Sequence, residues 1–158
     1  MMRTYAPSEI KSLTNQEKHR KGRTEIQTAE LSFGSELYDS CVSALYYSAF
    51  QYVTALILTK GENVSSKHTY VRGWVNKNLG ATGTMPLELV KLYNRLMDHR
   101  SEADYSVTVS FSKDKVSDLM EQVRTSGPDT AARARFRNRF LDYIKTSPSC
   151  NCRSGKSR

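Results

Sequence analysis

The stretch that decides the fold lies at residues 36–60 and reads ELYDSCVSALYYSAFQYVTALILTK. Its apolar residues recur at spacings of three and four, which places them on one wide face of a helix. These residues are Leu37, Cys41, Leu45, Ala49, Tyr52, Val53 and Leu56. Gly61 follows the last of them, as expected at a helix C-terminus. The pattern predicts a long helix from about Glu36 to Lys60.

This stretch also has the length of a membrane span, because the 20 residues between Asp39 and Lys60 carry no formal charge. Serine, threonine and glutamine are scattered through it, together with three tyrosines. Its apolar density is therefore too low for a helix that faces lipid. We expect the buried central helix of a bundle, no membrane partner and no signal peptide, with the cytoplasm as the default location.

Further helical patterns surround the central one in a chain of 158 residues, a length that suits a single domain. Residues 1–14 form a polar lead-in that could turn helical after Pro7. The patterns predict helices from about Gln16 to Phe33, from Ser65 or Ser66 to Gly80, from Pro86 through Arg100, and from Ser112 or Lys113 to Gly127. Val107–Phe111 has the composition of a short β-like connector. The expected fold class is all-α, an antiparallel bundle of four to five helices with short turns and a basic C-terminal extension.

Charge separates the chain into parts. The formal net charge is +8, and residues 128–158 contribute eight Lys and Arg against two Asp, a net of +6. We therefore expect a lead-in at 1–14, a nearly neutral helical body at 15–127, and a basic helix with a disordered tail at 128–158. A basic tail attracts nucleic acid or an acidic protein partner, and it can equally serve solubility alone.

Alternating arginines mark the predicted basic helix, and two phenylalanines are interleaved with them at helical spacing. The residues are Arg133, Arg135, Arg137 and Arg139, with Phe136 and Phe140. Such a stretch could follow a nucleic-acid backbone while its aromatic rings stack on bases. Alternatively, it docks on a partner protein or on a second protomer.

The three cysteines give no disulfide framework, because their number is odd. Cys41 lies in the apolar run and is predicted to be in the core. Cys150 and Cys152 form a C-x-C sequence, but no further Cys or His lies nearby to complete a tetrahedral metal site. We expect neither a metal nor another cofactor.

Three short motifs carry a family resemblance. Residues 44–50, ALYYSAF, resemble the signature in the second helix of small bacterial and archaeal HEPN proteins (higher eukaryote and prokaryote nucleotide-binding). Residues 66–68, SKH, resemble the start of the family's third helix, and residues 99–105, HRSEADY, resemble the end of its fourth. The resemblance covers roughly residues 15–125. It implies a four- or five-helix bundle that commonly forms a homodimer.

Many HEPN proteins are metal-independent ribonucleases whose motif is an Arg followed four to six residues later by a His. Cleavage of RNA by its own 2′-hydroxyl needs a base, an acid and positive charge near the developing phosphorane; His can supply the first two and Arg the third. Arg100 matches the family's Arg, whereas Asp104 and Tyr105 occupy the region where the His would follow.

The resemblance gives each candidate a role. Arg100 would bind phosphate and stabilise the transition state, His68 or His99 would act as acid or base, and Asp104 and Tyr105 would orient them. The alternative is a structural role, in which Arg100 and Asp104 form an intrahelical ion pair that fixes the end of the helix. His99 directly precedes Arg100, so on a helix its side chain points roughly 100° away from that of Arg100. A histidine in this position is more often a surface residue than a catalytic one.

Two other features bear on the same site. His68 falls in the first turn of a predicted helix, where backbone N–H groups and the dipole favour an anion, and Lys67 could complete a phosphate site there. Tyr46 and Tyr47 are adjacent and cannot share a helix face. One should pack in the core, and the other should face the cleft or a dimer partner, with core packing favoured for both.

Three functions remain open. The leading hypothesis is a HEPN ribonuclease of a prokaryotic toxin–antitoxin or phage-defence system, with RNA or a nucleotide as ligand. The second is a non-catalytic module that binds nucleotide or RNA, or docks a partner such as a nucleotidyltransferase or an antitoxin. The third is a purely structural subunit whose apolar faces serve assembly.

Overall fold

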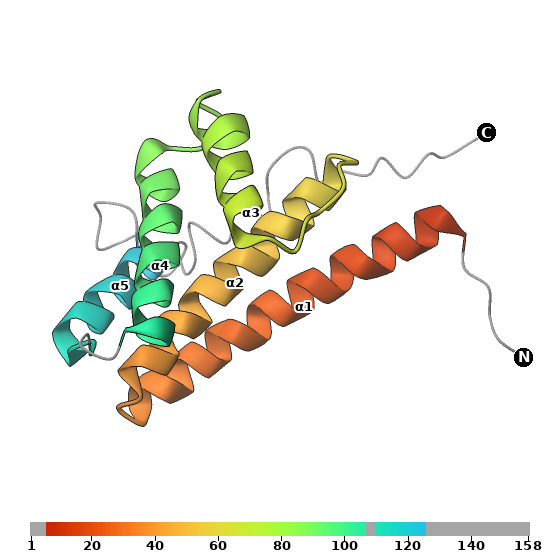
Figure 1. Ribbon diagram of the computed structural model, residues 1–158. Coiled ribbons are helices and arrows are strands. Elements are labelled where there is room, and N and C mark those ends of the chain that lie inside the picture. Colours follow the sequence, from red (N-terminus) through yellow and green to blue (C-terminus); the bar gives the residue numbers. More distant parts are fainter. Residues whose placement is uncertain (1–5, 107–109, 126–158) are drawn as a thin grey trace, which may run out of the picture.

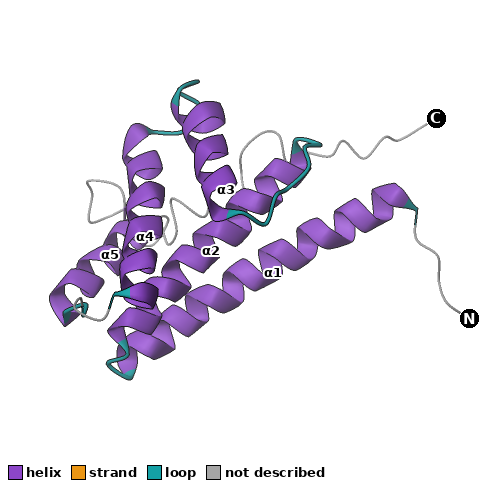
Figure 2. Cartoon of the chain, viewed as in Figure 1, coloured by secondary structure: helices purple, strands orange, loops and turns teal. Residues whose placement is uncertain are grey.

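The computed structural model describes residues 6–106 and 110–125. Its elements are α1 (Pro7–Gly34), α2 (Tyr38–Thr59), α3 (His68–Val75), the π-helical turn η1 (Asn76–Gly80), α4 (Leu87–Tyr105) and α5 (Lys113–Thr125) (Figure 1). The described residues contain no strand (Figure 2). The prediction of an all-α helical bundle is confirmed.

Helix α2 is the centre of the fold and packs against α1, α3, α4 and α5. Helix α1 runs antiparallel along one side of α2, and the three later helices lie on the other side (Figure 1). By length and composition α2 could cross a membrane, but 78% of its most apolar window is buried inside the fold. This is the pattern of a core helix, as the sequence predicted.

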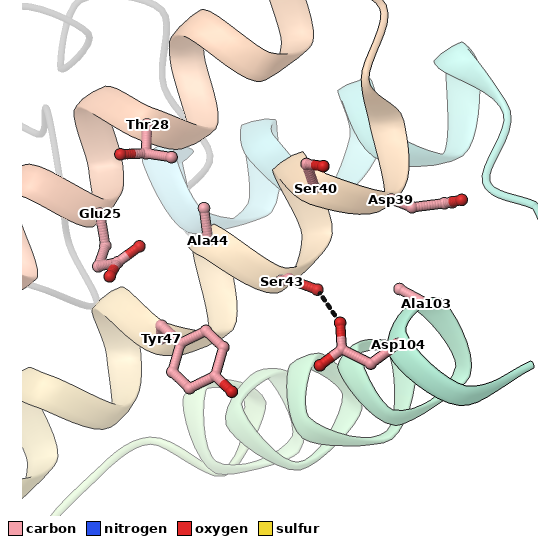
Figure 3. Close-up of a pocket in the computed structure, with 9 residues that line it drawn as sticks. All are labelled: Glu25, Thr28, Asp39, Ser40, Ser43, Ala44, Tyr47, Ala103 and Asp104. Carbon is pink, nitrogen blue, oxygen red and sulfur yellow. Dashed lines mark hydrogen bonds between the residues drawn. The ribbon is translucent and has the colours of Figure 1, made fainter.

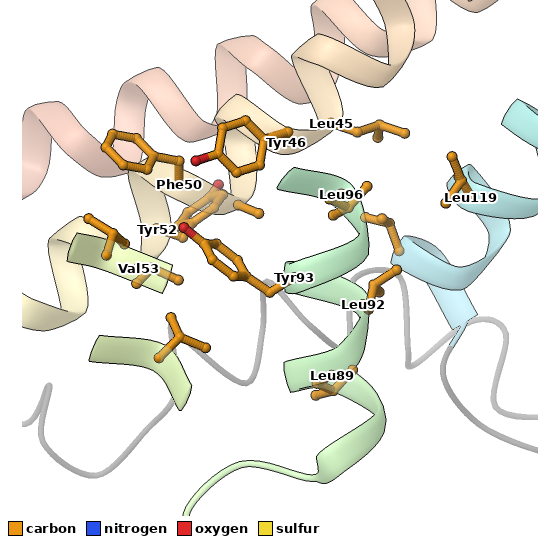
Figure 4. Close-up of a cluster of buried hydrophobic side chains, with 14 of the residues drawn as sticks. Leu45, Tyr46, Phe50, Tyr52, Val53, Leu89, Leu92, Tyr93, Leu96 and Leu119 are labelled. Carbon is orange, nitrogen blue, oxygen red and sulfur yellow. The ribbon is translucent and has the colours of Figure 1, made fainter. Parts of the chain in front are cut away.

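The hydrophobic core fills the space where α2 meets α3, η1, α4 and α5 (Figure 4). Its largest fully buried side chains are Tyr46, Tyr52, Tyr93, Leu56, Ile57, Leu79, Leu89, Leu92 and Leu96. Tyrosines form a notable part of this set, so hydroxyl groups lie among the leucines. A buried hydroxyl needs a hydrogen-bond partner, and for Tyr46 that partner belongs to the site described below.

Both long helices end in the same hydrogen-bonded turn. After α1, the Glu36 N–H donates to the Phe33 carbonyl at 3.1 Å and the Leu37 N–H donates to the Ser32 carbonyl at 2.8 Å. Glu36 adopts the left-handed conformation, with φ of 61°. Gly61 takes the equivalent place after α2, with φ of 78°. These are Schellman motifs, which satisfy carbonyls at a helix end and turn the chain.

The first helix begins at Pro7, earlier than the predicted start near Gln16. It therefore includes most of the predicted lead-in, residues 1–14. Pro7 opens α1, and the Glu9 carboxylate accepts the Ala6 N–H at 2.7 Å. Proline suits the first helical position because its fixed φ matches the helix and it lacks an N–H that would remain unpaired. The Asn15 side chain then donates to the Ala55 carbonyl at 3.0 Å, so α1 reaches the last turn of α2.

Helix α3 begins later than predicted, and neither Ser65 nor Ser66 is its N-cap. Lys67 occupies that position without a side-chain cap, and His68 is the first helical residue. The Ser65 hydroxyl instead accepts the Lys67 N–H at 3.2 Å in the preceding loop. His68, the first residue of α3, contacts Tyr46 of α2.

The connection into α5 is tied to α2, because Asp39 Oδ1 accepts the Phe111 N–H at 3.0 Å. Ser112 precedes α5 and accepts the Lys115 N–H at 3.4 Å, as predicted for a helix start. Residues 107–109 of the expected β-like connector lie outside the described residues. Residues 128–158, the predicted basic helix and tail, also lie outside the described residues.

Helices α1 and α2 approach each other closely at Gly22. A Cβ at this position would lie 2.6 Å from the nearest atom of the Tyr52 ring. The buried Ser48 hydroxyl donates to the Gly22 carbonyl at 2.8 Å, which fixes the contact. Glycine is therefore required by space here, in the middle of a helix where it otherwise costs stability.

Gly22→Ala is expected to lower the free energy of unfolding by about 1–3 kcal/mol, because Tyr52 is buried and cannot move aside freely. Gly73→Ala is the matched control: it also lies inside a helix, and nothing lies within 4 Å of its added Cβ. It should raise stability by about 0.5–1 kcal/mol through helix propensity. Urea unfolding followed by circular dichroism measures both, and equal effects of the two substitutions would contradict the close contact.

Candidate functional site

Three helices bring the candidate residues together. The middle of α2 supplies Tyr46 and Tyr47, the start of α3 supplies His68, and the last turns of α4 supply Arg100 and Asp104. We call these five residues the Arg100 cluster. Because α2 is apolar almost all round, α3 and α4 must both pack on it, and their ends meet beside its two tyrosines.

Arg100 is held by aromatic and acidic neighbours, and its side chain is only 15% exposed. Its Nη2 donates to the Tyr47 hydroxyl at 2.7 Å, and its Nε lies 2.7 Å from Asp104 Oδ2. The guanidinium lies 5.3 Å from the centroid of the Tyr47 ring and 5.4 Å from that of Tyr105. Burial opposes its charge, but the hydrogen bond to Tyr47 and the Asp104 carboxylate outweigh burial and raise the pKa of Arg100.

Asp104 joins α4 to α2 as well as pairing with Arg100. Its Oδ1 accepts a hydrogen bond from the Ser43 hydroxyl at 2.7 Å (Figure 3). Ser43 lies four residues before Tyr47, so both face α4 from the same side of α2. The predicted i,i+4 ion pair therefore forms, and it is part of a contact between two helices. Ser43 was not singled out from the sequence, although this spacing could have indicated it.

His68 lies against the two tyrosines of α2. Its Nδ1 is 2.7 Å from the Tyr46 hydroxyl, and its ring centroid is 4.6 Å from that of Phe50 and 5.9 Å from that of Tyr47. Burial lowers the pKa of His68, and the nearby positive charge of Arg100 lowers it further. The imidazole is therefore neutral at physiological pH.

The two adjacent tyrosines differ in burial: Tyr46 is fully buried and Tyr47 only partly so, although the sequence favoured core packing for both. Tyr47 contacts Arg100 through its hydroxyl and His68 through its ring. It is thus the link between the two parts of the cluster. Tyr105 lies at the outer edge and is 74% exposed.

His99 is not brought to this cluster. Its Nδ1 is 3.1 Å from Glu102 Oε2, and its ring packs edge-on against Phe111, with centroids 5.4 Å apart. Adjacent positions on a helix point in different directions, so His99 faces the start of α5 while Arg100 faces α2. These contacts of His99 are therefore with Glu102 and Phe111 and not with the Arg100 cluster.

Apart from Arg100, the structure describes one of the predicted phosphate ligands, Lys67. Lys67 is exposed at the N-cap of α3, next to His68 in the chain. The arginines of the predicted basic helix lie outside the described residues: Arg133, Arg135, Arg137 and Arg139.

An acidic pocket adjoins the cluster on the side of Asp104 (Figure 3). Its volume is about 310 Å³, and α1, α2 and α4 line it with Glu25, Asp39, Ser43, Tyr47 and Asp104 among others. Burial raises the pKa of Glu25. Among residues 6–106 and 110–125, no group of three or more His, Cys, Asp or Glu could hold a metal ion. The pocket favours cationic or N–H-bearing groups and opposes phosphate.

Comparison with known proteins agrees with the fold. The HEPN domain family matches residues 16–125. An uncharacterised-family (UPF0332) protein of Thermotoga maritima is 37% identical over 103 residues, which cover 65% of this chain and 77% of that protein. A protein of Methanocaldococcus jannaschii named "putative toxin" is 33% identical over 102 residues, covering 65% of this chain and 69% of that protein.

The helical bundle, the cluster at the ends of α3 and α4, and the match over 16–125 agree with one another. The chain belongs to the HEPN domain family.

Proposed function

We propose that this protein is the HEPN component of a prokaryotic toxin–antitoxin or phage-defence system, and that its Arg100 cluster binds a phosphate group of RNA or of a nucleotide. One observation carries the proposal: a nearly buried guanidinium is fixed by Tyr47 and Asp104 beside a neutral His68. The similarity to the Methanocaldococcus jannaschii protein named "putative toxin" supports the cellular setting.

The fixed guanidinium suits phosphate recognition. A guanidinium has five N–H donors, and the contacts with Tyr47 and Asp104 are made through Nη2 and Nε. Because the side chain is already ordered, less conformational entropy is lost when a phosphate binds. Hydrogen bonds between charged partners are also stronger than neutral ones.

The direction of approach follows from the charges. Glu25, Asp39 and Asp104 line the pocket on one side of Tyr47, and they repel an anion. His68 and the N-terminus of α3 are not among the residues that line this pocket, and the backbone N–H groups of a helix N-terminus favour negative charge. A phosphate therefore reaches Arg100 from the side of His68, and exposed Lys67 lies near that path.

A second candidate function, metal-independent RNA cleavage, is favoured by the position of His68. In that reaction a base removes the 2′-hydroxyl proton, the 2′-oxygen bonds to phosphorus, and the bond to the 5′-oxygen breaks as an acid protonates it. His68 is the histidine that shares Tyr47 with Arg100. Binding is the stronger proposal, since Asp104 and Tyr105 stand where the family's catalytic histidine would follow Arg100.

Assembly belongs to the same proposal. A homodimer would place two Arg100 clusters in one particle, and an antitoxin or nucleotidyltransferase partner would control access to them. We expect such assemblies in the cytoplasm, where RNA is available. Docking such a partner without any nucleic-acid ligand is the alternative function of the module.

Arg100→Ala is expected to weaken binding of a fluorescent single-stranded RNA by about 10- to 100-fold, because hydrogen bonds to charged groups contribute about 1.5–3 kcal/mol. Fluorescence anisotropy at low salt measures the affinity, since phosphate-dominated binding is strongest there. Arg95→Ala is the matched control, an exposed arginine on the same helix. Equal losses for both variants, or no binding by the wild type, would refute the phosphate site.

Cleavage is tested with the same proteins. Purified wild type is incubated with total RNA in EDTA, beside Arg100→Ala and His68→Ala. The ribonuclease candidate predicts fragments with wild type and a loss of at least about 100-fold with either variant, the range expected for acid–base groups. RNA that stays intact although it binds would leave the protein as a binding module and dismiss His68 as a catalytic residue.

A further inference from the structure

One ring nitrogen of His68, Nδ1, is hydrogen-bonded within the protein. Nδ1 lies 2.7 Å from the hydroxyl of Tyr46, and the Phe50 ring packs against the imidazole. Because Tyr46 is fully buried, the Nδ1 edge of the imidazole faces the core. Nε2 is therefore the nitrogen that can meet a ligand.

The direction of the hydrogen bond follows from the groups around Tyr46. Burial raises the pKa of Tyr46 to about 12, so its hydroxyl keeps its proton. Because this hydroxyl is buried, its proton needs an acceptor inside the protein. Nδ1 of His68 lies 2.7 Å from it.

A hydroxyl has one proton to donate. A phenol O–H is a better donor than a neutral imidazole N–H, and an imidazole nitrogen is a better acceptor than a phenol oxygen, so the Tyr46 proton points to Nδ1 of His68. A neutral imidazole that accepts at Nδ1 carries its proton on Nε2. The contact between Tyr46 and His68 therefore leaves an Nε2–H group at the edge of the Arg100 cluster.

We propose that Tyr46 is a positioning residue that holds His68 as its Nε2–H tautomer, so that the neutral ring donates a hydrogen bond to a phosphate oxygen beside Arg100. This inference rests on the proposed function and specifies the part that His68 plays in it. With Nδ1 engaged by Tyr46 and a proton already on Nε2, neutral His68 has no free lone pair to accept a proton from a 2′-hydroxyl. The arrangement serves binding in preference to base catalysis.

The tautomer is measured directly by ¹⁵N NMR of histidine-labelled protein at pH 8, with His68→Gln used to assign the resonances. The expected result is a proton on Nε2 in the wild type and a shift of the population toward Nδ1–H in Tyr46→Phe. Tyr70→Phe is the control, because Tyr70 is exposed and lies in the same helix as His68; it should change nothing. A wild-type proton on Nδ1, or an unchanged population in Tyr46→Phe, would overturn the inference.

Substitution of His68 separates donor from base. The amide nitrogen of His68→Gln can replace the Nε2–H group, and it cannot act as a base. Affinity for the fluorescent RNA should stay within about 3-fold of wild type in His68→Gln and fall about 10-fold in His68→Ala, the loss of one hydrogen bond to a charged group. Equal losses in the two variants would refute the donor role. Wild type with the Nε2–H tautomer but without RNA binding would refute the proposed function alone.

Discussion

Burial of α2 is the constraint on which the rest of the structure depends. A helix that is apolar on nearly all sides must be covered by other helices, and α1, α3, α4 and α5 each cover part of it. At Gly22 the cover is so close that no side chain fits. Tyr46 and Tyr47 interrupt the apolar surface near its middle, and their hydroxyls need partners. His68 and Arg100 provide those partners, so the packing of the core also builds the site.

The sequence predicted what periodic patterns encode, and it missed what depends on contacts between helices. The spacing from Leu37 to Leu56 located α2, and Gly61 located its end. The predicted start of α3 is wrong because serine is a preferred N-cap residue, whereas the Ser65 hydroxyl accepts the Lys67 N–H in the preceding loop. Glu36 adopts a left-handed conformation that favours glycine, and the local sequence does not predict this conformation.

The site follows the same division. Arg100 and Asp104 were predicted as a pair from their spacing, and the ion pair forms. Their bonds to Tyr47 and Ser43 join residues 53 and 61 positions apart in the chain, which no local pattern reveals. The result is a cluster whose formal charges balance, with an acidic pocket that adjoins Asp104 and the N-terminus of α3 at His68. Its selectivity for phosphate must therefore come from fixed donors more than from net charge.

The most direct test of the account is an NMR titration that compares adenosine monophosphate with adenosine, observing the Arg100 side-chain N–H groups and the His68 ring. The two ligands differ only in the phosphate. We expect the monophosphate to shift both sets of resonances and adenosine to leave them unchanged. Equal shifts with both ligands, or shifts confined to residues of the acidic pocket such as Glu25, would contradict a phosphate site at Arg100.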